Sequence, residues 1–303
     1  MPLSEENPFP FDHRIRFQAE GHIYFVDGVP VDKSVSTVVA GDRKPFDAPC
    51  VARQCYYGWR SKGDKSEYWH IIKREVDGEI TPEKAQQEIC DLWATAGPLG
   101  TELHSILEEH IEETMSFRRP LLKPHPILFP EIVMFNRFLM TLSPTLVPVR
   151  TELRVIAHGV PGTIDLLARD IETGEYIIFD YKRVKPTKKL TRGKLHKEYS
   201  LQLSCYAVAF ESLVPGAVVG KMFLVRLHAN APDYELVRCT DLRDVANRLL
   251  ADFAICPPGG GIQCDGVDRV DSGGSAPMVC TDHFCARDDD AGSASSRLEK
   301  SGD

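Results

Sequence analysis

The sequence predicts an α/β (α+β) fold in which helices flank a small central sheet. Three extended runs rich in β-branched and aromatic residues follow one another between residues 144 and 185, as expected for an antiparallel meander. Segments with helical spacing of apolar residues come before and after these runs. With 303 residues, 43% of them apolar, the chain is long enough to fill a substantial core.

The first elements expected are a β-hairpin and a helix. In GHIYFVDGVPVD, residues 21–32, the dipeptide Asp27-Gly28 is of the kind favoured in tight hairpin turns. Residues 47–73 have a helical pattern with scattered aromatic side chains.

Three further helices precede the strands. Thr81 as N-cap and Pro82 at the first position mark the start of one helix, and Gly97-Pro98 is expected to end it. The next helix should begin at Gly100, and another should begin at Pro130 after a proline-rich loop.

The predicted meander consists of residues 145–156, 162–170 and 175–185. A helix over residues 197–213 should follow. The remaining elements are strands over residues 218–228 and 234–239 and a helix over 240–255 that begins at an Asp/Thr cap.

Charge is distributed unevenly along the chain, whose formal net charge is −8. Residues 182–197, KRVKPTKKLTRGKLHK, hold eight Lys or Arg and no acidic residue, which makes a polyanionic partner plausible. Residues 256–303 hold nine acidic and four basic residues, a net of −5, among Gly, Ser and Pro. This composition predicts a disordered tail. We therefore expect an N-terminal extension over 1–20, a single domain over 21–255 and a tail over 256–303.

The cellular setting can be predicted only coarsely. The nine cysteines have irregular spacing and the first residues lack the apolar core of a secretory signal, so a reduced, intracellular location is expected. The sequence has no apolar run near the ~20 residues that span a bilayer, which predicts a soluble protein. The compartment and protein partners are not predicted.

The hairpin between the second and third strands brings two carboxylates together. If residues 171–174 form a four-residue loop, the numbers of paired residues sum to 345, and Asp165 lies opposite Asp180. Two carboxylates roughly 5 Å apart repel each other unless a proton or cation lies between them, and Mg²⁺ or Mn²⁺ suits carboxylate oxygens. Lys182 follows on the same face of the strand. The alternative is an edge strand with a solvated charged face.

These residues resemble a known family. Gly162-Thr-Ile-Asp165 followed by Asp180-Tyr-Lys182 resembles the core of the PD-(D/E)XK nucleases, and further motifs resemble the RecB-type branch, which includes the CRISPR adaptation nucleases and the mitochondrial genome maintenance exonuclease. These motifs are Gly100-Thr-Glu-Leu-His104, Glu152 and Gln202-Leu-Ser-Cys-Tyr206. The resemblance implies a restriction-endonuclease-like core over residues 100–228 with a small mixed sheet, preceded by a helical part over residues 45–142.

The resemblance also implies roles for individual residues. His104, Asp165, Asp180 and the Tyr181 carbonyl would be metal ligands, with Lys182 as the catalytic lysine and Glu152 a less certain partner. Gln202 and Tyr206 would support the site or touch nucleic acid. The basic run would contact the DNA backbone through Arg183, Lys185, Lys188, Lys189 and Arg192.

Simpler interpretations exist for several of these residues. Glu108, one helical turn after His104, is expected to be a solvated glutamate, and Gln202 and Tyr206 could be packing residues. The aromatic residues between Tyr56 and Trp69 could stack on unpaired bases, although core packing is their commoner use. The late cysteines and a neighbouring histidine could suggest a zinc or iron-sulfur site, but their spacing is not that of known sites and free thiols are expected (Cys256, Cys264, Cys280, Cys285, His283).

The sequence thus predicts a Mg²⁺- or Mn²⁺-dependent DNA nuclease, an exonuclease acting on single strands or free ends. Three rivals remain open: an endonuclease, a non-catalytic nucleic-acid-binding module of the same fold, and a metal-dependent hydrolase of small phosphoesters.

Overall fold

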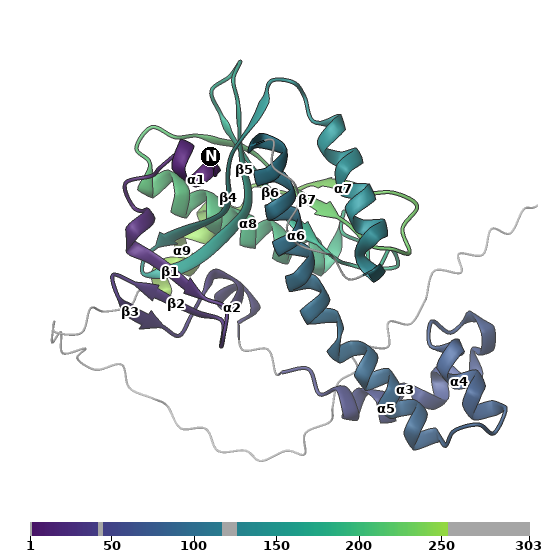
Figure 1. Ribbon diagram of the computed structural model, residues 1–303. Coiled ribbons are helices and arrows are strands. Elements are labelled where there is room, and N and C mark those ends of the chain that lie inside the picture. Colours follow the sequence, from purple (N-terminus) through teal and green to yellow (C-terminus); the bar gives the residue numbers. More distant parts are fainter. Residues whose placement is uncertain (1, 42–44, 117–125, 254–303) are drawn as a thin grey trace, which may run out of the picture. The chain divides into compact units, whose positions relative to one another are not determined.

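The central sheet has five strands, and their order along the sheet is the order along the chain. The computed structural model describes residues 2–41, 45–116 and 126–253 (Figure 1). All neighbouring strands are antiparallel except β6 and β7, which are parallel, so the sheet is mixed as predicted. The strands are β4 (Leu146–Ala157), β5 (Val160–Asp170), β6 (Tyr176–Lys182), β7 (Val219–Arg226) and β8 (Glu235–Arg238).

The predicted register of the β5–β6 hairpin is confirmed. The ladder pairs Leu166 with Phe179 and Arg169 with Tyr176, and each pair sums to 345. The Asp170 N–H donates to the Glu175 carbonyl at 2.9 Å, which closes the four-residue loop. Gly174 in this loop has a φ of 76°, a conformation that suits glycine.

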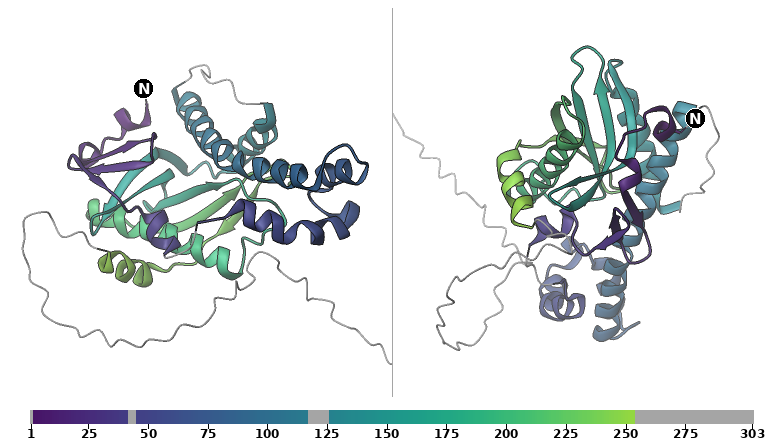
Figure 2. Two further views of the ribbon diagram at one scale, coloured as in Figure 1. Left: turned by 90° about the horizontal axis from the view of Figure 1, so that it is seen from below. Right: turned by 90° about the vertical axis from the view of Figure 1, so that its left-hand side faces the viewer.

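Strand β6 is a central strand with both faces covered. Ile178 packs in a core with helix α8 (Gly193–Leu213), whereas Phe179 and its neighbours pack in a second core with α6 (Ala96–Ser116) and α7 (Phe129–Thr141). Figure 2 shows these helices on opposite sides of the sheet. The alternative of an edge strand with a solvated face is therefore wrong, because β7 pairs with β6 along its length and Asp180 is only 2% exposed.

The N-terminal segment forms a second, three-stranded sheet. The predicted hairpin is confirmed as β2 (Ile23–Val26) and β3 (Val29–Val31), with Asp27 and Gly28 at positive φ in the turn. A strand that was not predicted, β1 (Ile15–Gln18), pairs with β2. Short helices lie before and after this sheet, α1 (Leu3–Glu6) and α2 (Val35–Ala40), together with a 3-10 turn at Asp12–Arg14.

Residues 45–94 form a compact unit of their own. Its helices are α3 (Ala48–Ser61), α4 (Trp69–Val76) and α5 (Pro82–Ala94), with a 3-10 turn at Gly63–Lys65, so the predicted helix over 47–73 is divided in two. Thr81 Oγ1 accepts the Lys84 N–H at 3.3 Å, which confirms Thr81 as N-cap. Tyr56 and Tyr68 are buried in the core of this unit, whereas Tyr57 is 66% exposed. Core packing is thus the use of two of the aromatic residues considered for base stacking.

Helix α6 begins at Ala96, four residues before the predicted start at Gly100. Gly97 and Pro98 lie in its first turn rather than in a break. Proline is tolerated there because the first N–H groups of a helix have no intrahelical acceptor. Another 3-10 turn, Pro126–Leu128, leads into α7. No helix in the described ranges is long and apolar enough to cross a membrane.

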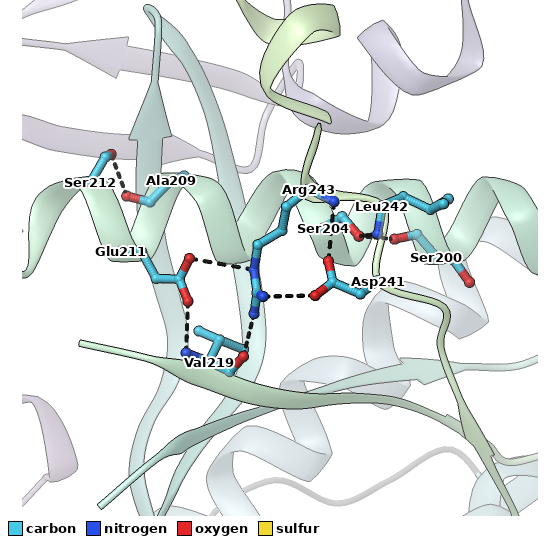
Figure 3. Close-up of polar contacts among 9 residues, drawn as sticks. All are labelled: Ser200, Ser204, Ala209, Glu211, Ser212, Val219, Asp241, Leu242 and Arg243. Atoms are coloured by element: carbon cyan, nitrogen blue, oxygen red, sulfur yellow. Dashed lines mark hydrogen bonds and ion pairs between the residues drawn. The ribbon is translucent and has the colours of Figure 1, made fainter. Parts of the chain in front are cut away.

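A polar network ties the C-terminal helix α9 (Arg243–Asp252) to α8 and β7 (Figure 3). Ser204 Oγ accepts the Leu242 N–H at 2.9 Å, and Glu211 accepts the Val219 N–H at 2.7 Å. The Arg243 guanidinium pairs with Glu211 and Asp241. The N-cap position of α9 is Leu242, which makes no side-chain cap hydrogen bond, rather than the predicted Asp or Thr. Asp241 nevertheless accepts the N–H of Arg243, the first residue of α9, through Oδ1 at 3.1 Å.

Gly162 is required by a close approach of Tyr206. A Cβ atom at position 162 would lie 2.6 Å from Tyr206 Cε1 and 3.0 Å from Val35 Cγ2, which is closer than van der Waals contact allows. We expect Gly162→Ala to lower the free energy of unfolding by about 1–3 kcal/mol through overpacking. Denaturant unfolding measures this change.

Gly100→Ala is the matched control, because Gly100 lies in α6 and a Cβ there would meet nothing within 4 Å. That variant should be as stable as the parent or up to about 1 kcal/mol more stable. In a Tyr206→Leu background the penalty of Gly162→Ala should shrink. An unchanged penalty would show that the Tyr206 ring is not its source.

Candidate catalytic site

Three acidic residues form a row across β4, β5 and β6 at a place where the strand ladders are interrupted. The β4–β5 ladder passes from Thr151↔Leu166 to Leu153↔Ile164 without a pair between Glu152 and Asp165. The β5–β6 ladder ends at Leu166↔Phe179, one step before Asp165 and Asp180 would meet. Glu152 also has a φ of 44°, unusual for a residue with a side chain. Regular strand pairing is therefore interrupted where the acidic residues lie.

Asp165 occupies the centre of this row and is 8% exposed. Its Oδ2 accepts the backbone N–H of Tyr181 at 2.6 Å and lies 3.5 Å from His104 Nδ1. Burial alone would raise the pKa of Asp165, but the nearby His104 and Lys182 outweigh burial and lower it. Asp165 is therefore a carboxylate at neutral pH.

His104 comes to the site from α6. Leu103 and Leu107 on the same helix are fully buried in the core shared with β6, and they orient the helix against the sheet. His104 Nε2 lies 3.1 Å from the carbonyl oxygen of Tyr181. Burial opposes protonation of the imidazole, but the Asp165 carboxylate prevails and raises the pKa of His104 to about 9.

His104, Glu152 and Asp165 together could hold a metal ion. One ligand atom from each lies within 4.8 Å of the others. A divalent ion with ligands at 2.0–2.1 Å separates adjacent ligand atoms by roughly 3 Å and opposite ones by roughly 4 Å, so a small inward movement would suffice. Burial, together with Asp165 and Glu108, raises the pKa of Glu152 to about 8, the response expected of a carboxyl group crowded by like charge. A cation would relieve that crowding.

Asp180 pairs with Lys182 and does not belong to this cluster. The Lys182 ammonium is in ion-pair contact with Asp180 Oδ2 and lies 5.2 Å from the centre of the Tyr199 ring. Burial raises the pKa of Asp180 to about 6 despite the opposing effect of Lys182. Asp180 and Asp165 raise the pKa of Lys182, so its side chain is a cation at neutral pH. The predicted role of Asp180 as a ligand stays a prediction, and Glu152 takes the third place in the cluster.

The two α8 residues form a supporting layer. The Gln202 amide donates to the Tyr206 hydroxyl at 2.8 Å, and the buried Tyr206 ring lies against Gly162. Burial and the nearby Asp180 raise the pKa of Tyr206 well above its usual value. Tyr206 is 5% exposed, which favours a packing role over direct contact with nucleic acid. Glu108 is half-buried, and its pKa is raised by burial and by Glu112.

The basic residues after Lys182 differ in exposure. Arg183 Nε lies 3.0 Å from Oε1 of Glu131, which is fully buried, so this guanidinium is engaged within the protein. Lys185 is half-buried, whereas Lys188, Lys189 and Arg192 are exposed. The latter three are therefore better placed to meet a polyanion than Arg183.

Two structural partners at this end of the sheet were not predicted. In the sequence, Glu131 is an ordinary acidic residue in the first turn of a helix, and Arg226 is an ordinary polar residue at the end of a strand. Only their burial distinguishes them, and burial is not visible in the sequence. The late cysteines and His283 lie outside the described residues. Within the described part, the cysteines are thiols rather than disulfides (Cys50, Cys55, Cys90, Cys205, Cys239).

Comparison with known proteins identifies a family. A family model described as the PD-(D/E)XK nuclease superfamily matches residues 87–255, more than half of the chain. No curated protein matches significantly. Thirteen chains of solved structures match, among them the crystal structure of SSO0001, with 17% identity over 60% of this chain and 68% of that chain and a TM-score of 0.28. That likeness is too low to inform the site.

Binding of Mn²⁺ should release protons. His104, with a pKa of about 9, and Glu152, with a pKa of about 8, are both protonated at pH 7 and must lose their protons before they bind a cation. We therefore expect about one to two protons released per ion, and an affinity that rises from pH 7 to pH 9. Calorimetry in two buffers of different ionisation enthalpy measures both quantities.

His104→Ala and Glu152→Gln should each reduce the number of protons released. Glu172→Gln, which alters an exposed glutamate in the β5–β6 loop, should not. Binding without proton release, or an affinity that falls as the pH rises, would contradict the ligand cluster.

Proposed function

Because the chain belongs to the PD-(D/E)XK nuclease superfamily, we propose that it is a divalent-metal-dependent deoxyribonuclease of the RecB-type branch, and specifically an exonuclease. The observation that carries this proposal is the cluster of His104, Glu152 and Asp165 beside the ion pair of Asp180 with Lys182. It places ligands for a cation next to a fixed ammonium group. Both kinds of positive charge stabilise the negative charge that develops during hydrolysis of a phosphodiester.

The cluster suits a hard divalent cation. Imidazole and carboxylate groups from His104, Glu152 and Asp165 would hold Mg²⁺ or Mn²⁺, and the Tyr181 carbonyl oxygen, 3.1 Å from His104 Nε2, is suited to join them. Asp180 remains a candidate ligand. When bound, such an ion lowers the pKa of water and withdraws charge from a phosphoryl oxygen.

Lys182 would act as a cation in this reaction. The raised pKa keeps its ammonium protonated, so it cannot accept a proton at neutral pH in this arrangement. Its charge can instead stabilise the negative charge that develops on the phosphoryl group. Asp180 forms an ion pair with the ammonium, and the centre of the Tyr199 ring lies 5.2 Å from it. The Asp165 bond to the Tyr181 N–H supports this geometry, because it fixes the backbone that carries Lys182.

The choice of DNA, and of the RecB-type branch, rests on sequence motifs and on charge. His104 of the GTELH motif lies beside Asp165 of GTID and Tyr181 of DYK, and this contact supports the resemblance on which the branch was inferred. Gln202 and Tyr206 of the last motif adjoin the same site. The exposed Lys188, Lys189 and Arg192 follow directly and could bind phosphates.

Lys182→Met should abolish cleavage of end-labelled DNA in Mg²⁺ or Mn²⁺, with a loss of at least about 10²-fold. DNA binding should stay within a few-fold, since the exposed cations Lys188, Lys189 and Arg192 are retained. The fold should tolerate the change because Asp180, with a pKa already near 6, can take up a proton when its partner is removed. Lys221→Met on β7 is the matched control, because Lys221 is an exposed lysine of the neighbouring strand.

The substrates used in that assay discriminate the rival functions. Digestion of linear but not circular DNA supports an exonuclease, and blocked 5′ or 3′ ends report its polarity. Cleavage of circular DNA indicates an endonuclease. Binding without cleavage in either metal ion indicates a non-catalytic module, and full activity of Lys182→Met would contradict the catalytic assignment.

A further inference from the structure

The basic segment, residues 183–192, is tied to the end of the sheet by Arg226. Arg226 is the last residue of β7 and pairs in register with Lys182 of β6. Its side chain is buried, with only 5% of the residue exposed. Its guanidinium donates to the carbonyl oxygen of Pro186 at 3.4 Å and to that of Lys188 at 2.5 Å. Glu235 on β8 lies 3.0 Å from the same guanidinium.

Other contacts hold the two ends of the basic segment. At its start, Arg183 pairs with the fully buried Glu131, which also accepts the Ala229 N–H at 3.2 Å. At its end, Leu190 is buried in the core beside α8, and its carbonyl oxygen lies 2.7 Å from His196 Nδ1. The segment is therefore fixed at its start, middle and end, unlike an ordinary solvated loop.

Three cationic side chains on this fixed backbone are exposed to solvent. Lys188, Lys189 and Arg192 are exposed, and they begin six residues after Lys182. A flexible basic loop would lose conformational entropy when it binds a phosphate backbone, whereas a fixed one has already lost it. The buried contacts thus favour binding without contributing a charge to the surface.

We propose that Arg226 is a positioning residue for the substrate: it fixes the basic segment so that Lys188, Lys189 and Arg192 hold the phosphate backbone of a DNA strand beside Lys182. This inference rests on the proposed nuclease function. Arg226 does not itself contact phosphate, since its guanidinium is buried and engaged with two carbonyl oxygens and Glu235.

An arginine is suited to this role by its geometry. The planar guanidinium offers five N–H donors in a rigid fork, so it can serve two carbonyl oxygens and a carboxylate at once. A lysine at the same position would keep the charge beside Glu235 but lacks the fork. Arg226→Lys therefore separates the charge of Arg226 from its ability to fix the segment.

The test compares Arg226→Lys and Arg226→Met with Arg238→Met. Arg238 is an exposed arginine on β8, so its replacement by Met removes the same charge as Arg226→Met without touching the segment. The probe is a fluorescein-labelled DNA single strand of about 20 nucleotides, long enough to reach several cations of the segment, titrated in EDTA at several salt concentrations. Steady-state cleavage in Mn²⁺ gives kcat and KM.

Both Arg226 variants should weaken DNA binding at least about tenfold at low salt, and the slope of log Kd against log salt should fall by about 0.7 for each phosphate that the protein no longer neutralises. KM should rise more than kcat falls. Arg238→Met should stay within about twofold, as expected for a surface charge remote from the phosphates. Removing the charges of Lys188, Lys189 and Arg192 should have less effect in the Arg226→Met background than in the parent, because those side chains are then no longer held in place.

Hydrogen exchange provides a readout that needs no DNA. Amides of residues 187–192 should exchange faster in both Arg226 variants than in Arg238→Met. Unchanged exchange, or faster exchange with unaltered DNA affinity, would overturn the proposal. If Arg226→Met does not fold, Arg226→Lys decides the outcome. A parent protein that neither binds nor cleaves DNA, with the expected exchange result, would refute the nuclease function and leave the structural link between Arg226 and the segment intact.

Discussion

The site depends on the balance of charge among three carboxyl groups brought together across neighbouring strands. Burial disfavours a charged carboxylate unless a cation or a set of donors compensates for it. His104 and the Tyr181 N–H compensate Asp165, and the Lys182 ammonium compensates Asp180. Glu152 is the least compensated of the three, since its pKa is raised to about 8. The protein thus contains a place where one further positive charge would be accepted, between Glu152, Asp165 and His104.

Two features of the scaffold create this arrangement. The interrupted ladders and the positive φ of Glu152 are departures from regular strand geometry at the acidic residues. The α6 helix, packed on the sheet through Leu103 and Leu107, supplies the histidine. On the other face, α8 places Tyr206 against Gly162 and Tyr199 near Lys182. Each of these side chains is therefore carried or contacted by an element packed in the core, which restricts its movement.

The end of the sheet that carries Lys182 also carries the residue that holds the basic segment. Lys182 ends β6 and leads into the basic segment, while its register partner Arg226 ends β7 and reaches back to that segment. Parallel pairing of β6 with β7 is what brings these two ends together. Lys182 and the cations that would hold a DNA strand consequently lie next to each other along the chain. The half-buried Arg183 and the buried Arg226 bind carboxylate and backbone groups there.

Local patterns in the sequence determined the β5–β6 hairpin and the positions of Asp165, Asp180 and Lys182 along it. A four-residue loop sets the register of β5 against β6, so neighbouring residues suffice for that prediction. The predicted pairing of Asp165 with Asp180 on one face stays a prediction, because the ladder ends at Leu166↔Phe179. The cap at Thr81 and the turn at Asp27-Gly28 are equally local. Only tertiary structure decided that β6 is central, because β7, the partner that covers its other edge, follows more than thirty residues later. Tertiary structure also brought Glu152 into the cluster and paired Arg183 with Glu131 and Arg226 with the basic segment. These contacts join residues that are distant in sequence. They depend on the pairing of charged groups in a packed core, and the local periodicity of the sequence does not indicate which charged groups will be buried.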